Sequence, residues 1–181
     1  MRFFGIFYFY SIVLFAQQSQ WQPITISDGL SQGMVFDLLQ DHEGYVWMAT
    51  KASLNRYDGS NFKQFTTHST PTYAITSNQT TALFEDSKKR LWIGTQNGDL
   101  NLYDARTQRF YHCFLDNKKN KNQTAGQHIY CMAEDSKGNI WVGTIVGKIF
   151  KITLSEELKK GDFPNEEDFT AQIKVIPLKT S

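Results

Sequence analysis

The sequence DSKGNIWVGT, at residues 135–144, is one of three copies of a ten-residue motif. DHEGYVWMAT occupies residues 41–50, and DSKKRLWIGT occupies residues 86–95. The tryptophans of successive copies are 45 and 49 residues apart. A repeat of about 40–50 residues is typical of the four-stranded blades of a β-propeller. The spacing therefore predicts a chain built from repeated blades.

Short runs of β-branched and aromatic residues surround each copy and are separated by turn residues, as expected of an all-β chain. In each copy the first run precedes the motif, and the second half of the motif forms the second run. The third and fourth runs follow the motif. In the third copy an acidic, lysine-containing insert at 155–168 precedes the last run, at 172–176. We expect an all-β fold with about three four-stranded antiparallel blades of an incomplete β-propeller. The blades are expected at residues 35–68, 69–115 and 116–178.

The first half of the motif has the chemistry of a tight turn. Aspartate at the start of a turn accepts backbone N–H groups, and glycine three residues later can adopt a positive φ. Lys89 stands at the glycine position of the second copy. Lysine is strained in the left-handed region, so a different type of turn is expected there.

The second half of the motif alternates along a strand, which places the tryptophan and the small residue two positions later on one face. The small residue leaves room beside the indole, against the neighbouring blade. Recurrence in every copy favours turn formation over catalysis for the aspartates, and core packing over sugar stacking for the tryptophans. All three tryptophans are expected to be buried in equivalent positions. The residues assigned this structural role are Asp41, Gly44, Trp47, Thr50, Asp86, Trp92, Gly94, Thr95, Asp135, Gly138, Trp141, Gly143 and Thr144.

The N-terminus has the features of a secretory signal peptide. Arg2 is followed by an apolar run at 3–16, which is shorter than the roughly 20 residues that span a bilayer. Leu14 is large for a cleavage site after Ala16, so a buried strand and an uncleaved anchor stay open as alternatives. We expect residues 1–20 to direct export to the periplasm. Residues 21–34 are expected to be an N-terminal strand segment, in which residues 21–26 form a strand that completes the last blade of a full ring.

The motifs resemble two-component regulator propeller repeats. The first copy is followed by LNRYDG at 54–59 and FKQF at 62–65, and SDGLS at 27–31 is similar to the opening of such sensors. The resemblance extends over about residues 21–154. It implies the N-terminal periplasmic sensor region of a bacterial hybrid histidine kinase, which detects an extracellular ligand, often a carbohydrate fragment.

Composition and spacing argue against other chemistry. A net charge of +1 provides no field that would attract nucleic acid. The two cysteines, Cys113 and Cys131, are interpreted as separate small core residues, with a disulfide between them left open. The histidines lack the spacing of metal ligands, and His42 is interpreted as a solvated turn residue. The arginines do not recur as a sialidase-like site would need. We expect no catalytic residue, metal or cofactor, and the chain contains no kinase motif.

Two functional hypotheses follow. The first is the N-terminal part of a periplasmic, carbohydrate-sensing propeller domain of a two-component sensor, lacking the kinase portion. The second is a secreted, stand-alone carbohydrate-binding or adhesion propeller with no signalling role. The expected partners are a small extracellular ligand such as an oligosaccharide, the remaining blades and kinase portion, and a second copy through dimerisation of the full-length protein. An open ring is expected to expose apolar surface and to associate. The sequence does not assign the ligand-binding residues.

Overall fold

The computed structural model describes residues 22–68, 73–115 and 127–163, together with the backbone of 172–176. The expected signal peptide therefore lies outside the described residues. In the described part of the chain, no helix has the length and the apolar character needed to cross a membrane.

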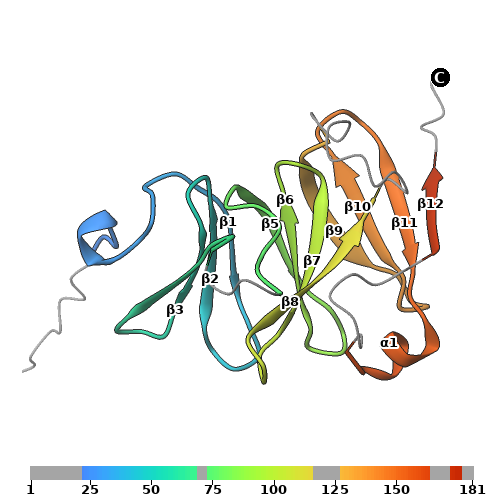
Figure 1. Cartoon of the computed structure of the whole chain (residues 1–181), viewed down its shortest axis with the longest axis horizontal. Helices are drawn as coiled ribbons and strands as arrows, with labels where there is room; N and C mark the ends of the chain where they lie inside the picture. Colours follow the sequence, from blue (N-terminus) through green and yellow to red (C-terminus); the bar gives the residue numbers. More distant parts are fainter. Residues whose placement is uncertain (1–21, 69–72, 116–126, 164–171, 177–181) are drawn as a thin grey trace, which may run out of the picture.

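Twelve strands form three four-stranded antiparallel sheets, and the strands of each sheet lie in sequence order (Figure 1). This arrangement confirms the predicted all-β propeller blades, and each sheet lies within one of the expected blade ranges. The first sheet contains β1 (Val35–Gln40), β2 (Val46–Thr50), β3 (Leu54–Tyr57) and β4 (Phe62–Phe65). The second contains β5 (Thr80–Glu85), β6 (Leu91–Thr95), β7 (Asp99–Asp104) and β8 (Arg109–Phe114). The third contains β9 (Ile129–Glu134), β10 (Ile140–Thr144), β11 (Ile149–Thr153) and β12 (Gln172–Ile176).

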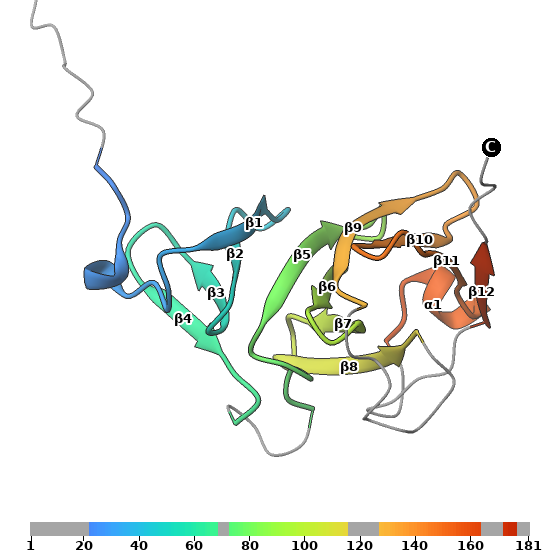
Figure 2. The same ribbon diagram turned by 90° about the horizontal axis from the view of Figure 1, so that it is seen from above.

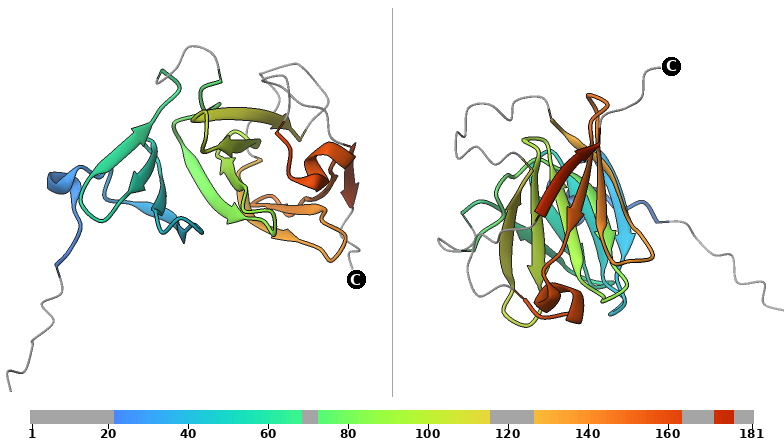
Figure 3. Two further views of the ribbon diagram at one scale, coloured as in Figure 1. Left: turned by 90° about the horizontal axis from the view of Figure 1, so that it is seen from below. Right: turned by 90° about the vertical axis from the view of Figure 1, so that its right-hand side faces the viewer.

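The three blades follow one another along the long axis of the molecule and pack face to face (Figures 2 and 3). Their first strands are neighbours, since β5 contacts both β1 and β9. One apolar core lies between blades 1 and 2, and a second lies between blades 2 and 3. The molecule is therefore held together by two successive sheet-on-sheet interfaces of the same kind.

Each interface is filled by the motif tryptophan of one blade and the third strand of the next. Trp47 is 1% exposed, and its ring centroid lies 5.0 Å from that of Tyr103 on β7. Trp92 is fully buried in the core that contains Ile152, which occupies the position of Tyr103 on β11. Trp141 is only half-buried, because the described residues contain no blade beyond the third. The expectation of three equivalent buried indoles is therefore wrong for the last one.

The small motif residue permits close approach between blades. A Cβ atom built on Gly94 would lie 2.4 Å from Cγ2 of Ile129, which belongs to β9 of the next blade. Only glycine fits this contact without displacing the neighbouring strand.

We predict that Gly94→Ala destabilises the protein by about 1–3 kcal/mol, the usual cost of overpacking a core. Chemical denaturation would measure the loss. The double variant Gly94→Ala/Ile129→Ala should lose less than the sum of the single losses, because truncation of Ile129 removes Cγ2, the nearer of its two clashing atoms, and leaves only Cβ, at 2.7 Å. Gly143→Ala is the matched control: its Cβ meets the Sγ of the exposed Cys131, which has room to rotate. Strictly additive losses would show that Gly94 and Ile129 do not compete for space.

The N-terminal segment differs from its prediction. Residues 22–34 contain the 3₁₀-helix η1 (Ile26–Asp28) and no strand. A strand needs a neighbouring strand, because its backbone N–H and carbonyl groups require hydrogen-bond partners. The segment that contains η1 contacts β4 through side chains of β4 and not through a backbone ladder. Gly29 lies against Phe62, and its carbonyl accepts a hydrogen bond from Nε2 of Gln64 at 2.9 Å.

The insert between β11 and β12 begins with α1 (Glu156–Lys160), a short helix that the sequence analysis does not predict. Ser155 caps its N-terminus and Gly161 ends it with a φ of 101°. Leu158 is buried in the core of blades 2 and 3, and its carbonyl accepts a hydrogen bond from the guanidinium of Arg90. The first part of the insert thus docks on blade 2, beside the turn that precedes β6.

The two cysteines are free thiols in different surroundings. Cys113 on β8 is buried, which raises the pKa of its thiol to about 12. Cys131 on β9 is exposed. It occupies the position of Ala82 on β5, which blade 3 covers. The expectation of two small core residues is therefore confirmed for Cys113 and wrong for Cys131.

Candidate ligand-binding face

One aspartate organises the turn between the first two strands of every blade. In blade 1, the carboxylate of Asp41 accepts the backbone N–H groups of Glu43 and Tyr45 at 3.0 and 2.9 Å. Its second oxygen accepts the indole N–H of Trp47 at 2.7 Å. Blades 2 and 3 repeat the three hydrogen bonds at Asp86 and Asp135, where the indole bonds measure 2.8 and 3.0 Å. The expected turn hydrogen bonds are present, and the bond to the tryptophan is an addition that the sequence analysis missed.

The turn of blade 2 has the same conformation as the other two, contrary to expectation. Lys89 has a φ of 61°, in the left-handed region that Gly44 and Gly138 also occupy at 92° and 74°. Its N–H donates to the carbonyl of Asp86 at 2.8 Å, as both glycines do to their own aspartates. The carboxylate of Asp86 holds this turn through additional bonds, including one from Nε of Arg90 at 2.7 Å. Surroundings that fix the backbone so fully can hold a residue in a strained conformation.

We predict that Lys89→Gly stabilises the protein by about 0.5–1 kcal/mol, because glycine has no Cβ penalty at positive φ. The reverse substitution, Gly138→Lys, places lysine in the equivalent turn of blade 3 and should lose a similar amount. Urea unfolding of both variants would measure these changes. A loss of stability in Lys89→Gly would show that the lysine side chain makes a contact worth more than the strain.

The hydrogen bonds to Asp135 in the turn of blade 3 predict how the stability of the protein depends on pH. Hydrogen bonds from Trp141 and then from Asn139 hold the pKa of Asp135 well below its usual range. A carboxyl group with a depressed pKa stabilises the fold above its unfolded pKa of about 3.9, and this contribution is lost as the pH falls further. The stability lost by Asp135→Asn should therefore be constant above about pH 5 and shrink below pH 4. Unfolding midpoints measured from pH 2 to 7 would show this, with Asp162→Asn, an exposed site, as control. A difference independent of pH would contradict it.

The final threonine of the motif closes the turn at the opposite end of the blade. Oγ1 of Thr95 donates to the carbonyl of Asp99 and accepts its N–H, both at 3.1 Å. Thr144 makes the same pair of bonds with Lys148 at 3.1 and 3.2 Å. The motif thus specifies both ends of its strand, the aspartate one turn and the threonine the other.

Hydrogen bonds at the turns also join successive blades. Nδ1 of His42 lies 2.6 Å from Oε1 of Glu85, at the end of β5 in the next blade. Ser87, the equivalent turn residue of blade 2, binds Glu134 of blade 3 through its N–H and its hydroxyl at 2.7 and 2.8 Å. His42 is an exposed turn residue, as interpreted, and its bond to Glu85 is a contact that the sequence analysis missed. The signal was the glutamate that directly precedes the motif aspartate in the second and third copies.

The turns that contain these aspartates lie at one end of the blades, beside α1, and we call this end the turn face (Figure 1). Two hollows open on it, one at each blade junction. The first hollow, between blades 1 and 2, has a volume of about 280 Å³, and its walls include Trp47, Arg56, Lys89 and Tyr103. The second hollow, between blades 2 and 3, has a volume of about 380 Å³ and is lined mostly by charged and hydroxyl side chains. Both are large enough for a sugar-sized ligand.

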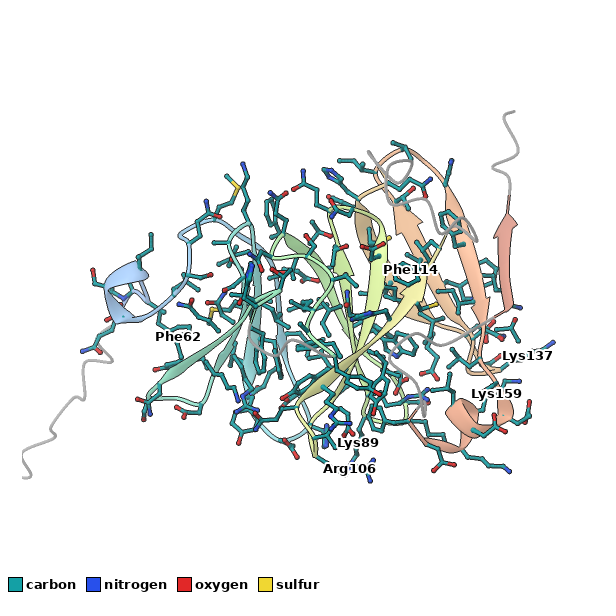
Figure 4. All side chains as sticks on the ribbon, viewed as in Figure 1. Phe62, Lys89, Arg106, Phe114, Lys137 and Lys159 are labelled. Carbon is teal, nitrogen blue, oxygen red and sulfur yellow. The ribbon has the colours of Figure 1, made fainter. Side chains whose placement is uncertain are left out.

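Cationic side chains surround both hollows. Lys89 and Arg106 lie beside the first hollow, and Lys137 and Lys159 lie beside the second (Figure 4). Most of the lining carboxylates already have partners: the aspartates hold their turns, and the glutamates at the ends of β5 and β9 bind the preceding blade. The turn face therefore offers more uncommitted positive than negative charge.

The described residues include no group of histidine, cysteine, aspartate and glutamate side chains arranged to hold a metal ion. The motif aspartates lie in separate blades and are each engaged by their own turn and tryptophan. The arrangement provides hydrogen-bond donors and cations at blade junctions, which is the chemistry of a binding surface.

Three meander sheets that pack face to face, each tryptophan entering the next blade, define a segment of a β-propeller. Residues 29–52, 74–97 and 125–145 match the family model of the two component regulator propeller. The three matched stretches are therefore similar to two-component regulator propeller repeats.

Solved structures share this architecture. The extracellular domain of BT3049 from B. thetaiotaomicron, described as a hybrid two component system, is 25% identical, with a TM-score of 0.62. The alignment covers 80% of this chain and 21% of that one. The extracellular domain of BT4673 from the same organism is 24% identical, with a TM-score of 0.58, and the alignment covers 85% and 21% of the two chains.

A curated relative is similar over a shorter stretch. "Histidine kinase P4" of Formosa agariphila is 43% identical over 60 residues, which are 32% of this chain and 4% of that protein. This chain thus matches about a fifth of the length of the solved structures and a small part of the curated relative.

Proposed function

We propose that this chain is the N-terminal part of an extracytoplasmic ligand-sensing propeller domain of a two-component sensor. The observation that carries the proposal is the threefold regulator-propeller motif, joined by blade interfaces of one repeated design. The similarity to an extracellular domain of a hybrid two component system over 80% of the chain supports the same role. The apolar run at 3–16 supports export to the periplasm.

The outer faces of the first and last blades support further blades as partners. Leu38 on β1 is 61% exposed, whereas Leu83, its equivalent on β5, is 7% exposed because blade 1 covers it. At the other end, Trp141 is half-buried where Trp47 and Trp92 are enclosed by a following blade. Each open face carries the residues that the internal interfaces bury, so each is suited to another blade of the same repeat.

The ligand that we propose is a small saccharide bound at the turn face. The hollows have sugar-sized volumes, and charged and hydrogen-bonding side chains line both of them; aromatic side chains, among them Trp47 and Phe163, also line the first hollow. Binding sites for small molecules combine a concave surface with a few convergent polar groups. The role of the chain in this proposal is recognition, and phosphoryl transfer belongs to a kinase portion in the same polypeptide.

The proposal predicts that Trp141 becomes buried in a longer polypeptide. In the 181-residue chain, acrylamide should quench Trp141 fluorescence more strongly than that of Trp47, measured in variants that retain one tryptophan. Extension through the coding sequence downstream of Ser181 should add blades that protect Trp141, followed by kinase motifs. The Trp47-only variant is the control, because its environment is complete in both proteins. A stop codon directly after Ser181, in a chain that binds saccharide, would overturn the sensor proposal and support a stand-alone binding module.

A further inference from the structure

The side chain of Tyr103 has an unusual environment within the first hollow. Tyr103 is 3% exposed, and its hydroxyl is buried without a hydrogen-bond partner in the described structure. Burial raises the pKa of this hydroxyl to about 12, so it stays protonated and can donate. A buried hydroxyl without a partner costs free energy unless a ligand completes its hydrogen bonding.

The equivalent positions of the other blades avoid this cost. In blade 1, the hydroxyl of Tyr57 donates to the carbonyl of Gly59 at 2.7 Å. In blade 3, the position is Ile152, which has no polar atom. The unpaired hydroxyl is therefore a property of the first hollow and not of the repeat.

Arg56 provides a cation in the same hollow. Its Cζ lies 4.2 Å from the ring centroid of Tyr45 and 5.8 Å from that of Trp47. Within the described residues its guanidinium forms no ion pair or hydrogen bond, whereas Nζ of Lys151, its equivalent in blade 3, lies 3.6 Å from the carboxylate of Asp135. A planar guanidinium suits two oxygens of one carboxylate or sulfate. Because no hydrogen bond fixes Arg56, it can shift to admit a ligand to the covered hydroxyl.

The mouth of the hollow adds two more cations. Lys89 projects from the strained turn of blade 2, and Arg106 lies close to it (Figure 4). Arg106 is already 3.4 Å from Asp104 and largely exposed, so it offers long-range attraction more than a fixed contact. Four carboxylates also line the hollow, and protein donors engage those of Asp41, Glu85 and Asp104. The fourth belongs to Glu43, which is exposed, and the lining cations outnumber the four carboxylates.

We propose that the first hollow binds an oxyanion group, a carboxylate or sulfate, of an acidic saccharide, with Arg56 and the Tyr103 hydroxyl as its contacts. This inference rests on the proposed ligand-binding role and names the chemistry of the group that is bound.

Isothermal titration calorimetry of the purified chain at low ionic strength would test it, with D-galacturonate, sodium sulfate and D-galactose as probes. Galacturonate should bind at least tenfold more tightly than galactose, and sulfate should compete with it. Arg56→Gln should weaken galacturonate binding about tenfold or more, the usual effect of losing a charge-assisted hydrogen bond. Arg109→Gln is the matched control, because Arg109 also lies over an aromatic ring, that of Tyr73, but does not line the hollow.

Tyr103→Phe separates binding from folding. This variant should weaken galacturonate binding several-fold without lowering the unfolding midpoint of the ligand-free protein, because it removes only an unpaired hydroxyl. Loss of stability with unchanged binding would overturn the role of Tyr103. Equal affinity for galactose and galacturonate would overturn the oxyanion inference and leave saccharide sensing intact. Binding of none of the probes would also overturn the inference, whereas the proposed sensor role is decided separately by the downstream coding sequence.

Discussion

The hydrogen bond from the motif tryptophan to the motif aspartate connects every level of this structure. The same carboxylate accepts the backbone N–H groups of its turn and the indole N–H six residues further on, at 2.7–3.0 Å in all three blades. A charged acceptor makes such bonds shorter and stronger than neutral ones. The bond orients the indole at the start of the second strand, so that its ring enters the next blade. Local turn geometry and the interface between blades therefore depend on one side chain.

The blades are joined by a design that repeats with small variations. A tryptophan packs on the third strand of the next blade, a small residue admits the first strand of the next blade, and a turn residue binds a glutamate there. In a repeat protein, stability is the sum of such nearest-neighbour terms. These contacts are present at both junctions between the described blades, and the corresponding residues on the two outer faces lack them. The exposure of Leu38 and the incomplete burial of Trp141 thus have one cause: each lies on an outer blade face that no further described blade covers.

The sequence predicted those features that depend on local chemistry. Alternating strands, aspartate turns and the role of Gly94 follow from the residues of a single repeat, and the structure shows each of them. The errors concern contacts between repeats. The bond of His42 reaches a glutamate 43 residues away, and the burial of a tryptophan depends on its neighbouring blade. The left-handed Lys89 is the exception, since the turn that holds it, fixed by Asp86 and Arg90, lies within one repeat. The unpaired hydroxyl of Tyr103 was equally beyond sequence reasoning, because a tyrosine at the same position of blade 1 has a partner.

Two energetically unfavourable features, a strained backbone conformation and an unpaired buried hydroxyl, occur beside the same hollow. Lys89 adopts a backbone conformation that glycine adopts at the same position of the other blades, and Tyr103 buries a hydroxyl that the other blades pair or omit. The two residues lie in different turns and strands, yet both line the first hollow. Backbone strain and an unpaired hydrogen-bond donor are independent of each other, so imperfect packing alone does not explain why both occur at one site. A binding site does, since sites tolerate local costs that a bound ligand offsets. The coincidence favours the first hollow over the second, whose polar side chains largely have partners within the protein.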